Sequence, residues 1–303
     1  MQHIFDIHFA VIEKDIEKCK LLLQDKNNVN LKTSYNMTPL LYACCGTDNF
    51  EILKLLVESG ANVNDVDDNG DTPLLTLCRV SCDRDRILYL IENKANIYAK
   101  NNMDDTCLII ASGNINCSSI TLHCLIERLC MPTSNELMIY LQTENKNGHN
   151  LFFSACVSGN LNIMMYLSKY DFNINQKNKF NHTCLMSAFY FLQNTNNNFY
   201  NNIKNIIDYL IRNGYDINIL NNHGENILCI MMGGYHNIIQ NCIMYKPIYG
   251  DINLNPIQQS AYENAYDIFL YLVEKGAQIK YPCYEVAKYL QFDNIVKFIE
   301  QKN

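Results

Sequence analysis

The chain has 303 residues, of which 48% are hydrophobic and 18% charged, and this composition predicts a folded core rather than a disordered chain. A formal net charge of -7 and a pI near 5.5 argue against a general nucleic-acid binder, because affinity for phosphate backbones comes from clustered Lys and Arg. The sequence has neither an apolar run of about 18 residues nor a basic start followed by an apolar segment, so we expect no membrane span and no signal peptide. We therefore expect a cytoplasmic or nuclear protein whose 14 cysteines stay reduced.

A polar turn followed by a short apolar helix recurs along the chain. Its copies are TPLLYAC (38–44), TPLLTLC (72–78), TCLIIAS (106–112), NLFFSAC (150–156), TCLMSAF (183–189), NILCIMM (226–232) and NPIQQSA (255–261). The leading threonines, Thr38, Thr72, Thr106 and Thr183, are expected to cap these helices through their hydroxyls. Pro39 and Pro73 occupy the first helical position, where a missing N–H costs nothing.

A second apolar helix and a turn follow most copies. These segments are FEILKLLVESGANVN (50–64), RILYLIENKANIY (86–98), LNIMMYLSKYDFNIN (161–175), IIDYLIRNGYDINIL (206–220) and YDIFLYLVEKGAQIK (266–280). Two helices and a projecting turn, repeated near every 33 residues, resemble the ankyrin-repeat family over nearly the whole chain. The resemblance implies an all-α solenoid of stacked helix-turn-helix units with projecting β-turn or hairpin fingers. It also implies a non-enzymatic scaffold that binds a protein partner.

We predict one ankyrin-repeat domain over residues 1–303. Its expected units are 1–32 as an N-terminal cap, 33–66, 67–100, 101–144 with an insertion, 145–177, 178–220 with an Asn-rich protruding loop at 193–202, 221–249, 250–279 and 280–303 as a C-terminal cap. The end units diverge because each has only one neighbour to pack against.

Two departures from the family pattern are consistent with this fold. Where the family prefers glycine in the turn, the chain has residues that tolerate a left-handed backbone, namely Asn36, Gly70, Asp104, Gly148, Asn181 and Gly224. Cysteine replaces alanine at Cys44, Cys78 and Cys156, and proline at Cys107 and Cys184. Small apolar thiols pack well between helices, so we expect these cysteines to be structural.

The sequence contains no signature of catalysis, and we predict no catalytic residue, metal ligand or cofactor. Cys117, His123, Cys124 and Cys130 cluster in the insertion, but the chain has no CxxC pair of the kind that structural zinc sites use. A second hypothesis stays open. It is an enzyme or a protein that binds a small ligand or metal, with its site in 113–145 or in 233–250 near His236 and Cys242, where the repeat register is lost.

The projecting fingers and the ends of the first helices are the expected partner-binding surface, because solenoids bind through such extended faces. Exposed aromatic and methionine side chains dominate interface energies, and charged neighbours add selectivity. The predicted binding residues are Tyr35, Met37, Asp71, Met103, Asp105, His149, Phe180, His182, Tyr190 and Phe191. We expect a monomer that binds a protein and neither nucleic acid nor membrane.

The preference for Asn, Ile, Lys and Tyr indicates an AT-rich coding genome. In this respect the chain resembles ankyrin proteins of poxviruses and other large DNA viruses, although an intracellular bacterium or a protist fits as well. The viral resemblance implies a factor that engages host signalling or ubiquitin ligases. Such proteins often end in an F-box-like segment, whereas QFDNIVKFIEQKN here reads as a closing repeat, so recruitment by that route is not expected.

Overall fold

A computed structural model describes residues 6–46, 50–190, 198–234 and 256–302. The chain divides into two compact units. Unit 1 comprises residues 1–155 and 162–170, and unit 2 comprises residues 156–161 and 171–303. In the described ranges the regular structure is helical, with isolated antiparallel bridges at Lys100–Thr106 and Lys177–Thr183. The predicted all-α class is confirmed, and the prediction of one repeat domain over the whole chain stays a prediction.

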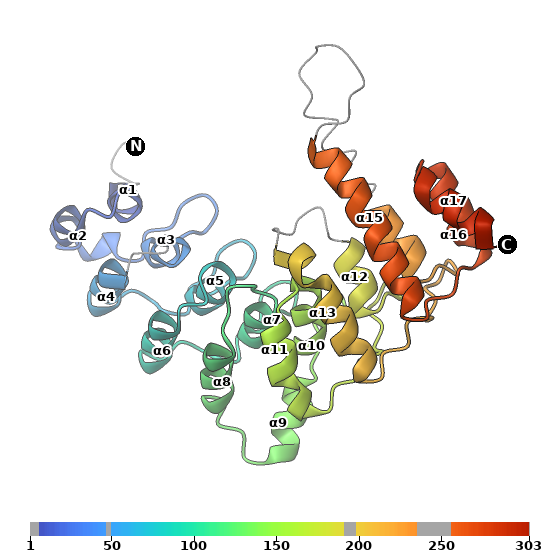
Figure 1. Cartoon of the computed structure of the whole chain (residues 1–303). Helices are drawn as coiled ribbons and strands as arrows, with labels where there is room; N and C mark the ends of the chain where they lie inside the picture. Colours follow the sequence, from blue (N-terminus) through green and yellow to red (C-terminus); the bar gives the residue numbers. More distant parts are fainter. Residues whose placement is uncertain (1–5, 47–49, 191–197, 235–255, 303) are drawn as a thin grey trace, which may run out of the picture. The chain divides into compact units, whose positions relative to one another are not determined.

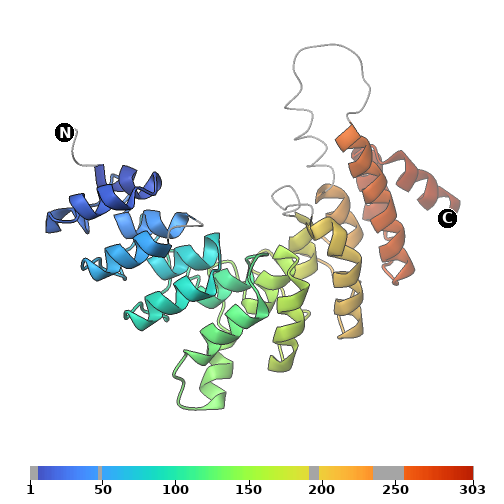
Figure 2. The ribbon, with the colours of Figure 1, turned by 60° about the vertical axis from the view of Figure 1, so that its left-hand side comes forward.

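Unit 1 is a series of helix pairs (Figures 1 and 2). The pairs are α1 (Asp6–Ile12) with α2 (Ile16–Leu22), α3 (Pro39–Cys45) with α4 (Phe50–Glu58), α5 (Pro73–Val80) with α6 (Arg84–Glu92), and α7 (Cys107–Ser112) with α8 (Ser119–Glu127). They are followed by α9 (Ser134–Leu141), the first part of α10 (Leu151–Ser158) and most of α11 (Leu161–Leu167). The first helices α1, α3, α5 and α7 pack side by side in chain order, and α2 packs on α4.

Local capping explains where the first helices begin. Oγ1 of Thr38, Thr72 and Thr106 accepts a hydrogen bond from the third backbone N–H that follows, at 3.3, 3.3 and 3.2 Å. Thr183 does the same for the N–H of Met186 at 3.4 Å. Pro39 and Pro73 lie at the first helical positions. The predicted helix starts are therefore confirmed, each by hydrogen bonds within a few residues.

The cores between the helices are apolar. Leucine and isoleucine side chains such as Leu40, Leu53 and Leu74 are fully buried, and burial of each stabilises the fold by about 1.5–3 kcal/mol. The predicted structural cysteines are buried as well: Cys44, Cys78, Cys107, Cys156 and Cys184. Their thiols fill the spaces that alanine or proline would otherwise occupy between helices.

The insertion predicted within residues 101–144 forms an additional helix. α8 is the second helix of its repeat, Ser118 caps it by accepting from Thr121 N at 3.1 Å, and α9 follows with Thr133 as its cap. The additional helix α9 therefore explains why the spacing between repeats is longer in this region.

Unit 2 contains α12 (Cys184–Tyr190), α13 (Asn198–Arg212), helical residues 227–234, α15 (Pro256–Glu274), α16 (Tyr281–Tyr289) and α17 (Asp293–Lys302). α16 packs against α17. Residues 191–197 and 235–255 lie outside the described residues, and with them part of the Asn-rich stretch and most of 233–250, including His236 and Cys242.

Two predictions for unit 2 were wrong. Residues 198–202 of the predicted protruding loop instead form the start of α13, which begins at Asn198. NPIQQSA and YDIFLYLVE are not separate helices but one continuous helix, α15. The residues that join them, YENA, include no glycine or proline that would end a helix, so the second helix simply continues the first.

Asparagines after the second helices tie each repeat to the next. Asn64 Nδ2 donates to Lys94 O at 3.0 Å, and its Oδ1 accepts from Asn96 N at 2.7 Å. Asn30, Asn175 and Asn218 make the same pair of bonds to the following repeat. These asparagines are the last residues of the recurring triplets NVN, NIN and DIN. Their hydrogen bonds between repeats were not predicted from the sequence.

Replacing Asn64 by alanine is expected to lower the free energy of unfolding by about 1–2 kcal/mol, since two inter-repeat hydrogen bonds are lost at a largely solvated site. Urea denaturation followed by circular dichroism measures the change. Asn116→Ala is the matched control, because Asn116 is exposed and its hydrogen bond within the described residues, to Asn114 Oδ1, comes from the backbone N–H, which alanine keeps. Equal stability of the two variants would contradict a stabilising role for the asparagine contacts.

Candidate interaction surface

Each finger is a short loop organised by the side chain of its first residue. The fingers are residues 33–37, 67–71, 101–105 and 145–149 in unit 1, and 178–182 and 221–225 in unit 2. In every finger the first N–H donates to the fifth carbonyl, at 2.9–3.2 Å. The side-chain oxygen of the first residue, Thr33, Asp67, Asn101, Asn145, Asn178 or Asn221, accepts from the third and fifth backbone N–H groups at 2.8–3.4 Å. The tips are therefore held in one conformation.

The fourth residue of every finger has a left-handed backbone, as the sequence predicted. Its φ angles are 57° at Asn36, 77° at Gly70, 60° at Asp104, 78° at Gly148, 60° at Asn181 and 72° at Gly224. Glycine, asparagine and aspartate tolerate this region best, which explains why only these three residue types occur there.

Gly70 is further constrained by the neighbouring finger. A Cβ at Gly70 would lie 2.8 Å from Asn102 Oδ1 and 2.9 Å from Asn102 N, whereas a Cβ at Gly60, also at positive φ, would meet nothing within 4 Å. Gly70→Ala is therefore expected to lower the free energy of unfolding by about 2–3 kcal/mol, and Gly60→Ala by about 1 kcal/mol. Thermal and urea unfolding of the pair measures the difference, and equal losses would contradict the close approach of the fingers.

Neighbouring fingers of unit 1 are joined through their backbones. Asp68 N donates to Tyr35 O at 3.3 Å, Asn102 N to Asn69 O at 2.9 Å, and Lys146 N to Met103 O at 2.9 Å. These bonds run from one tip to the next, so the four tips of unit 1 form a continuous edge.

The third residue of a finger projects outward. Tyr35 is 70% exposed and Met103 42% exposed in unit 1, and Phe180 is 61% exposed in unit 2. Tyr190, at the end of α12, is 50% exposed. These four predicted residues present apolar surface to solvent, which is the property that motivated their choice.

The fifth residues make contacts inside the protein. Asp71 is only 5% exposed, forms an ion pair with Arg79 at 2.9 Å and accepts from Asn101 Nδ2 at 2.8 Å. Asp105 is half-buried and accepts from Asn145 Nδ2 at 2.7 Å. Met37 is also half-buried. Asp71 and Asp105 were predicted as partner-binding residues, but the Asp71 carboxylate is engaged by Arg79 and Asn101 and the Asp105 carboxylate by Asn101 and Asn145. Sequence alone missed the links between fingers because these partners are distant in the chain.

The two predicted histidines rest against aromatic rings. His149 stacks on Phe153 with 4.3 Å between ring centroids, and His182 lies 5.8 Å from Tyr190. Burial lowers the pKa of His149 to about 4, against the opposing effect of Asp105, and burial also lowers the pKa of His182. Both imidazoles are therefore neutral near pH 7. Phe191 lies outside the described residues.

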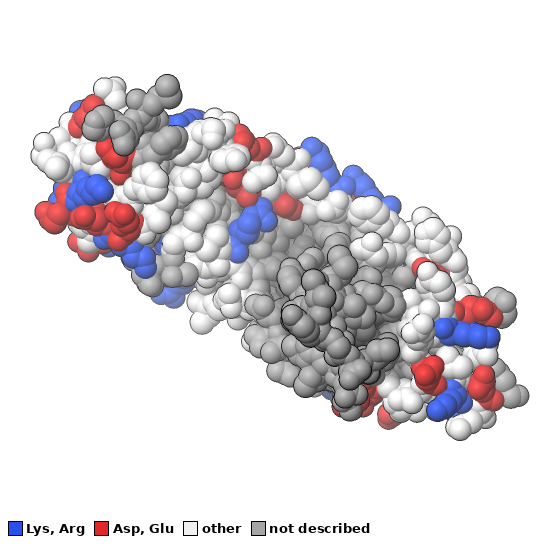
Figure 3. Space-filling view, turned by 90° about the horizontal axis from the view of Figure 1, so that it is seen from above, with Lys and Arg blue, Asp and Glu red and all other residues white. Residues whose placement is uncertain are grey.

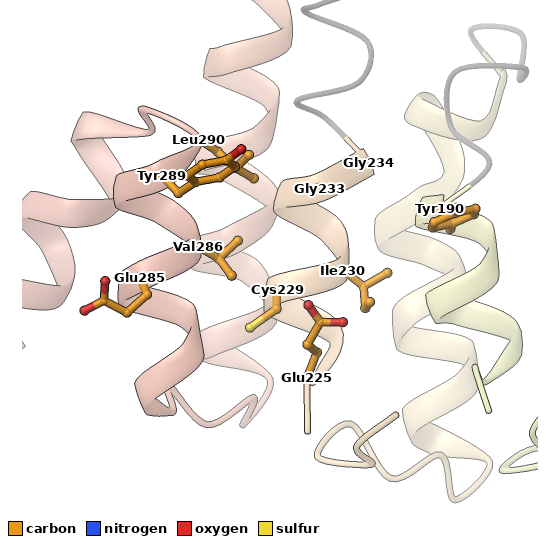
Figure 4. A pocket seen from close by; sticks show the side chains of 10 residues that line it. All are labelled: Tyr190, Glu225, Cys229, Ile230, Gly233, Gly234, Glu285, Val286, Tyr289 and Leu290. Atoms are coloured by element: carbon orange, nitrogen blue, oxygen red, sulfur yellow. The ribbon is translucent and has the colours of Figure 1, made fainter. Parts of the chain in front are cut away.

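Two hollows adjoin the fingers, one in each unit. In unit 1 a cavity of about 210 Å³ is bounded by the polar side chains of Arg79, Asp105, Asn145 and His149. In unit 2 a larger one of about 470 Å³ lies beside helical residues 227–234 (Figure 4). Its walls include Tyr190, Glu225 and Tyr289. Tyr289 was not among the predicted site residues, because in the sequence it lies in the predicted C-terminal cap, 280–303, and not in a finger.

Neither a cluster of metal ligands nor a helix suited to cross a membrane is found among the described residues. At the N-terminal end, left in Figure 3, basic and acidic side chains lie intermixed. Within residues 6–46, 50–190, 198–234 and 256–302, no three His, Cys, Asp or Glu side chains gather to hold a metal ion. His123 was considered with Cys117, Cys124 and Cys130 as a possible metal ligand. Its ring nitrogens instead lie 3.2 Å from Glu127 Oε1 and 3.0 Å from the hydroxyl oxygen of Tyr166. Among the described helices, none combines the length and apolar character that a membrane crossing requires.

Comparison with known proteins agrees with this geometry. Residues 7–101 match a family model described as ankyrin repeats, in 3 copies. None of the curated proteins matches the sequence. Among solved structures, the chain is similar to the ankyrin repeat domain of Bcl-3, described as a unique member of the IkappaB protein family. The identity is 20% and the TM-score 0.51, over 74% of this chain and 92% of that chain. The chain thus has the ankyrin-repeat fold, and residues 7–101 carry ankyrin repeats by sequence as well.

Proposed function

We propose that the chain is a non-enzymatic scaffold that binds a protein partner through its finger tips. The observation that carries the proposal is the exposed apolar residue at the third position of hydrogen-bonded fingers, at Tyr35, Met103 and Phe180. Because the finger backbones are already ordered by their hydrogen bonds, binding costs less conformational entropy. Large exposed anchors on a rigid support are typical of interface hot spots. Tyr190 is proposed as a further anchor beside the fingers of unit 2.

The fifth residues have a supporting part in this proposal. Asp71, His149 and His182 contact the helix that follows their finger, and Asp105 accepts from Asn145 of the next finger. A partner that lies along the tips meets the outer edges of these residues. Met37 has the same place in the first finger. We propose that these residues shape the surface and that the third residues anchor the partner.

The nature of the partner forms a finer proposal. We propose a host-cell protein of a signalling or ubiquitin pathway, bound in the host cytoplasm or nucleus by a monomer of this chain. The Asn-, Ile-, Lys- and Tyr-rich composition supports expression by a virus or another intracellular pathogen with an AT-rich genome.

The test is affinity capture from candidate host lysates with three baits. The first is the wild-type chain, the second carries Tyr35→Ala, Met103→Ala and Phe180→Ala, and the third carries Leu21→Ala, Ile120→Ala and Met165→Ala. The third set removes side chains that are comparably exposed but lie on helices away from the fingers. We expect the finger variant to lose a partner by tenfold or more, in line with about 2 kcal/mol for each hot-spot residue, and the control variant to retain it. Equal recovery by all three baits would count against the finger surface.

A further inference from the structure

Unit 2 contains a groove that shares only Tyr190 with the proposed finger surface. Helical residues 227–234 form its middle, α12 borders one side and α16 the other (Figure 4). Gly233 and Gly234 line it, and a Cβ built at Gly233 would meet nothing within 4 Å. These two glycines add no side chain to the groove.

The walls of the groove are aromatic and aliphatic. Tyr289 of α16 is 85% exposed and Tyr190 of α12 is 50% exposed, and both line the groove together with Ile230 and Val286. Exposed rings of this size are suited to bury against an apolar or planar group. In Figure 4 the two rings lie toward one end of the groove.

Glu225 of finger 221–225 and Glu285 of α16 also line the groove. In Figure 4 Glu225 lies near Cys229 and Ile230, and Glu285 extends from α16. Oε2 of Glu225 accepts from Asn221 Nδ2 at 2.8 Å, which orients the carboxylate. Within the described residues, neither glutamate forms a recorded ion pair with a lysine or arginine of this chain. The groove therefore combines apolar walls with uncompensated negative charge.

We propose that this groove binds an arginine side chain carried on an apolar segment of the protein partner. The inference rests on the proposed function and names the chemistry of a second contact. The apolar segment packs on Tyr190 and Tyr289, and the guanidinium pairs with a carboxylate of the groove. A guanidinium presents five N–H donors in a planar fork, which matches the geometry of a carboxylate. It is also more weakly hydrated than a lysine ammonium and stacks on aromatic faces.

A randomised nonapeptide display library, selected on the full chain, tests the proposal. Enriched peptides are synthesised with a fluorescein label, and their affinities are measured by fluorescence polarisation against the wild type and four variants. Glu225→Gln with Glu285→Gln removes the charges and keeps the shape, and Gly233→Leu fills the groove. Glu58→Gln with Glu274→Gln is the charge-matched control, since both are exposed glutamates outside the groove. The finger triple variant completes the set, and each peptide is also made with citrulline in place of arginine.

We expect enriched peptides to carry arginine beside apolar residues. Their affinity should fall about tenfold with citrulline or with the Glu225 and Glu285 variant, as for two partly solvated ion pairs. It should fall at least as far with Gly233→Leu and stay within about twofold for the control. Circular dichroism verifies that each variant is folded, and the glutamine variant keeps the test valid if Gly233→Leu unfolds.

Three results would overturn the inference: selection that yields no binder, enriched peptides without a basic residue, or affinity unchanged in the Glu225 and Glu285 variant. Peptides that lose affinity only in the finger triple variant would overturn the groove and support the proposed function. Peptides that lose affinity in the groove variants but not in the finger variant would support the groove and count against the finger surface. The two proposals therefore fail separately.

Discussion

Replacing Arg86 by methionine is expected to lower the free energy of unfolding by about 3 kcal/mol, although Arg86 is not a candidate binding residue. Arg86 is on α6 and only 1% exposed. Its Nη1 donates to Gly46 O and its Nη2 to Ala43 O, both at 2.6 Å. These carbonyls belong to the C-terminal end of α3, where a helix has no intrahelical donors and its dipole favours a cation.

The size of the effect follows from what methionine leaves behind. Hydrogen bonds to a charged group contribute about 1.5–3 kcal/mol each, and methionine returns only part of that by filling the apolar space. Urea denaturation measures the change. Arg84→Met is the matched control, because Arg84 lies on the same helix, is exposed and pairs only with the exposed Asp85. A loss below about 1 kcal/mol for Arg86→Met would show that water replaces the guanidinium at the end of α3.

Lowering the pH from 6.5 to 4 is expected to destabilise the protein through His149 by about 3 kcal/mol. The pKa of His149 is about 4 in the folded protein, because burial against Phe153 disfavours the charged imidazole, and its ordinary value is 6.5. Between these values the unfolded chain binds a proton at this residue that the folded chain does not. Stability therefore rises with pH across this window and is lost as the pH falls through it. Each pKa unit of difference corresponds to about 1.4 kcal/mol.

His149→Gln isolates this contribution. Burial also lowers the pKa values of His8 and His182, so they change stability in the same direction. The measurement is the difference between wild type and variant in the free energy of unfolding at pH 6.5 and at pH 4. An unchanged pH dependence in the variant, or an NMR titration of the imidazole near 6.5, would contradict the burial of His149.

The finger turns were predictable because each depends on residues within five positions of one another. Asn101 accepts from the N–H groups of Met103 and Asp105, and Asp104 takes the left-handed backbone. The helix caps are equally local, as Thr38 with Leu41 illustrates. Residue types with special backbone or capping properties therefore identify these elements directly.

Other features of unit 2 were not predictable in this way. The segment 255–280 looked like another copy of the repeat, yet it forms the single helix α15, because a weak resemblance to the motif at NPIQQSA is not accompanied by a turn. The groove beside residues 227–234 combines Tyr190, Glu225 and Tyr289. These residues are 35 or more positions apart, and only Tyr190 had a sequence signal strong enough to be chosen.

By itself, the sequence determined the helical class, the ankyrin fold, the starts of the first helices and the positions of the exposed tips. These depend on periodicity and on hydrogen bonds between near neighbours in the chain. The tertiary structure alone decided which polar side chains are buried. Asp71 meets Asn101 of the next finger, and Arg86 meets Ala43 of the preceding repeat. Such contacts depend on how successive repeats stack, and stacking brings together residues whose spacing in the chain carries no local signal.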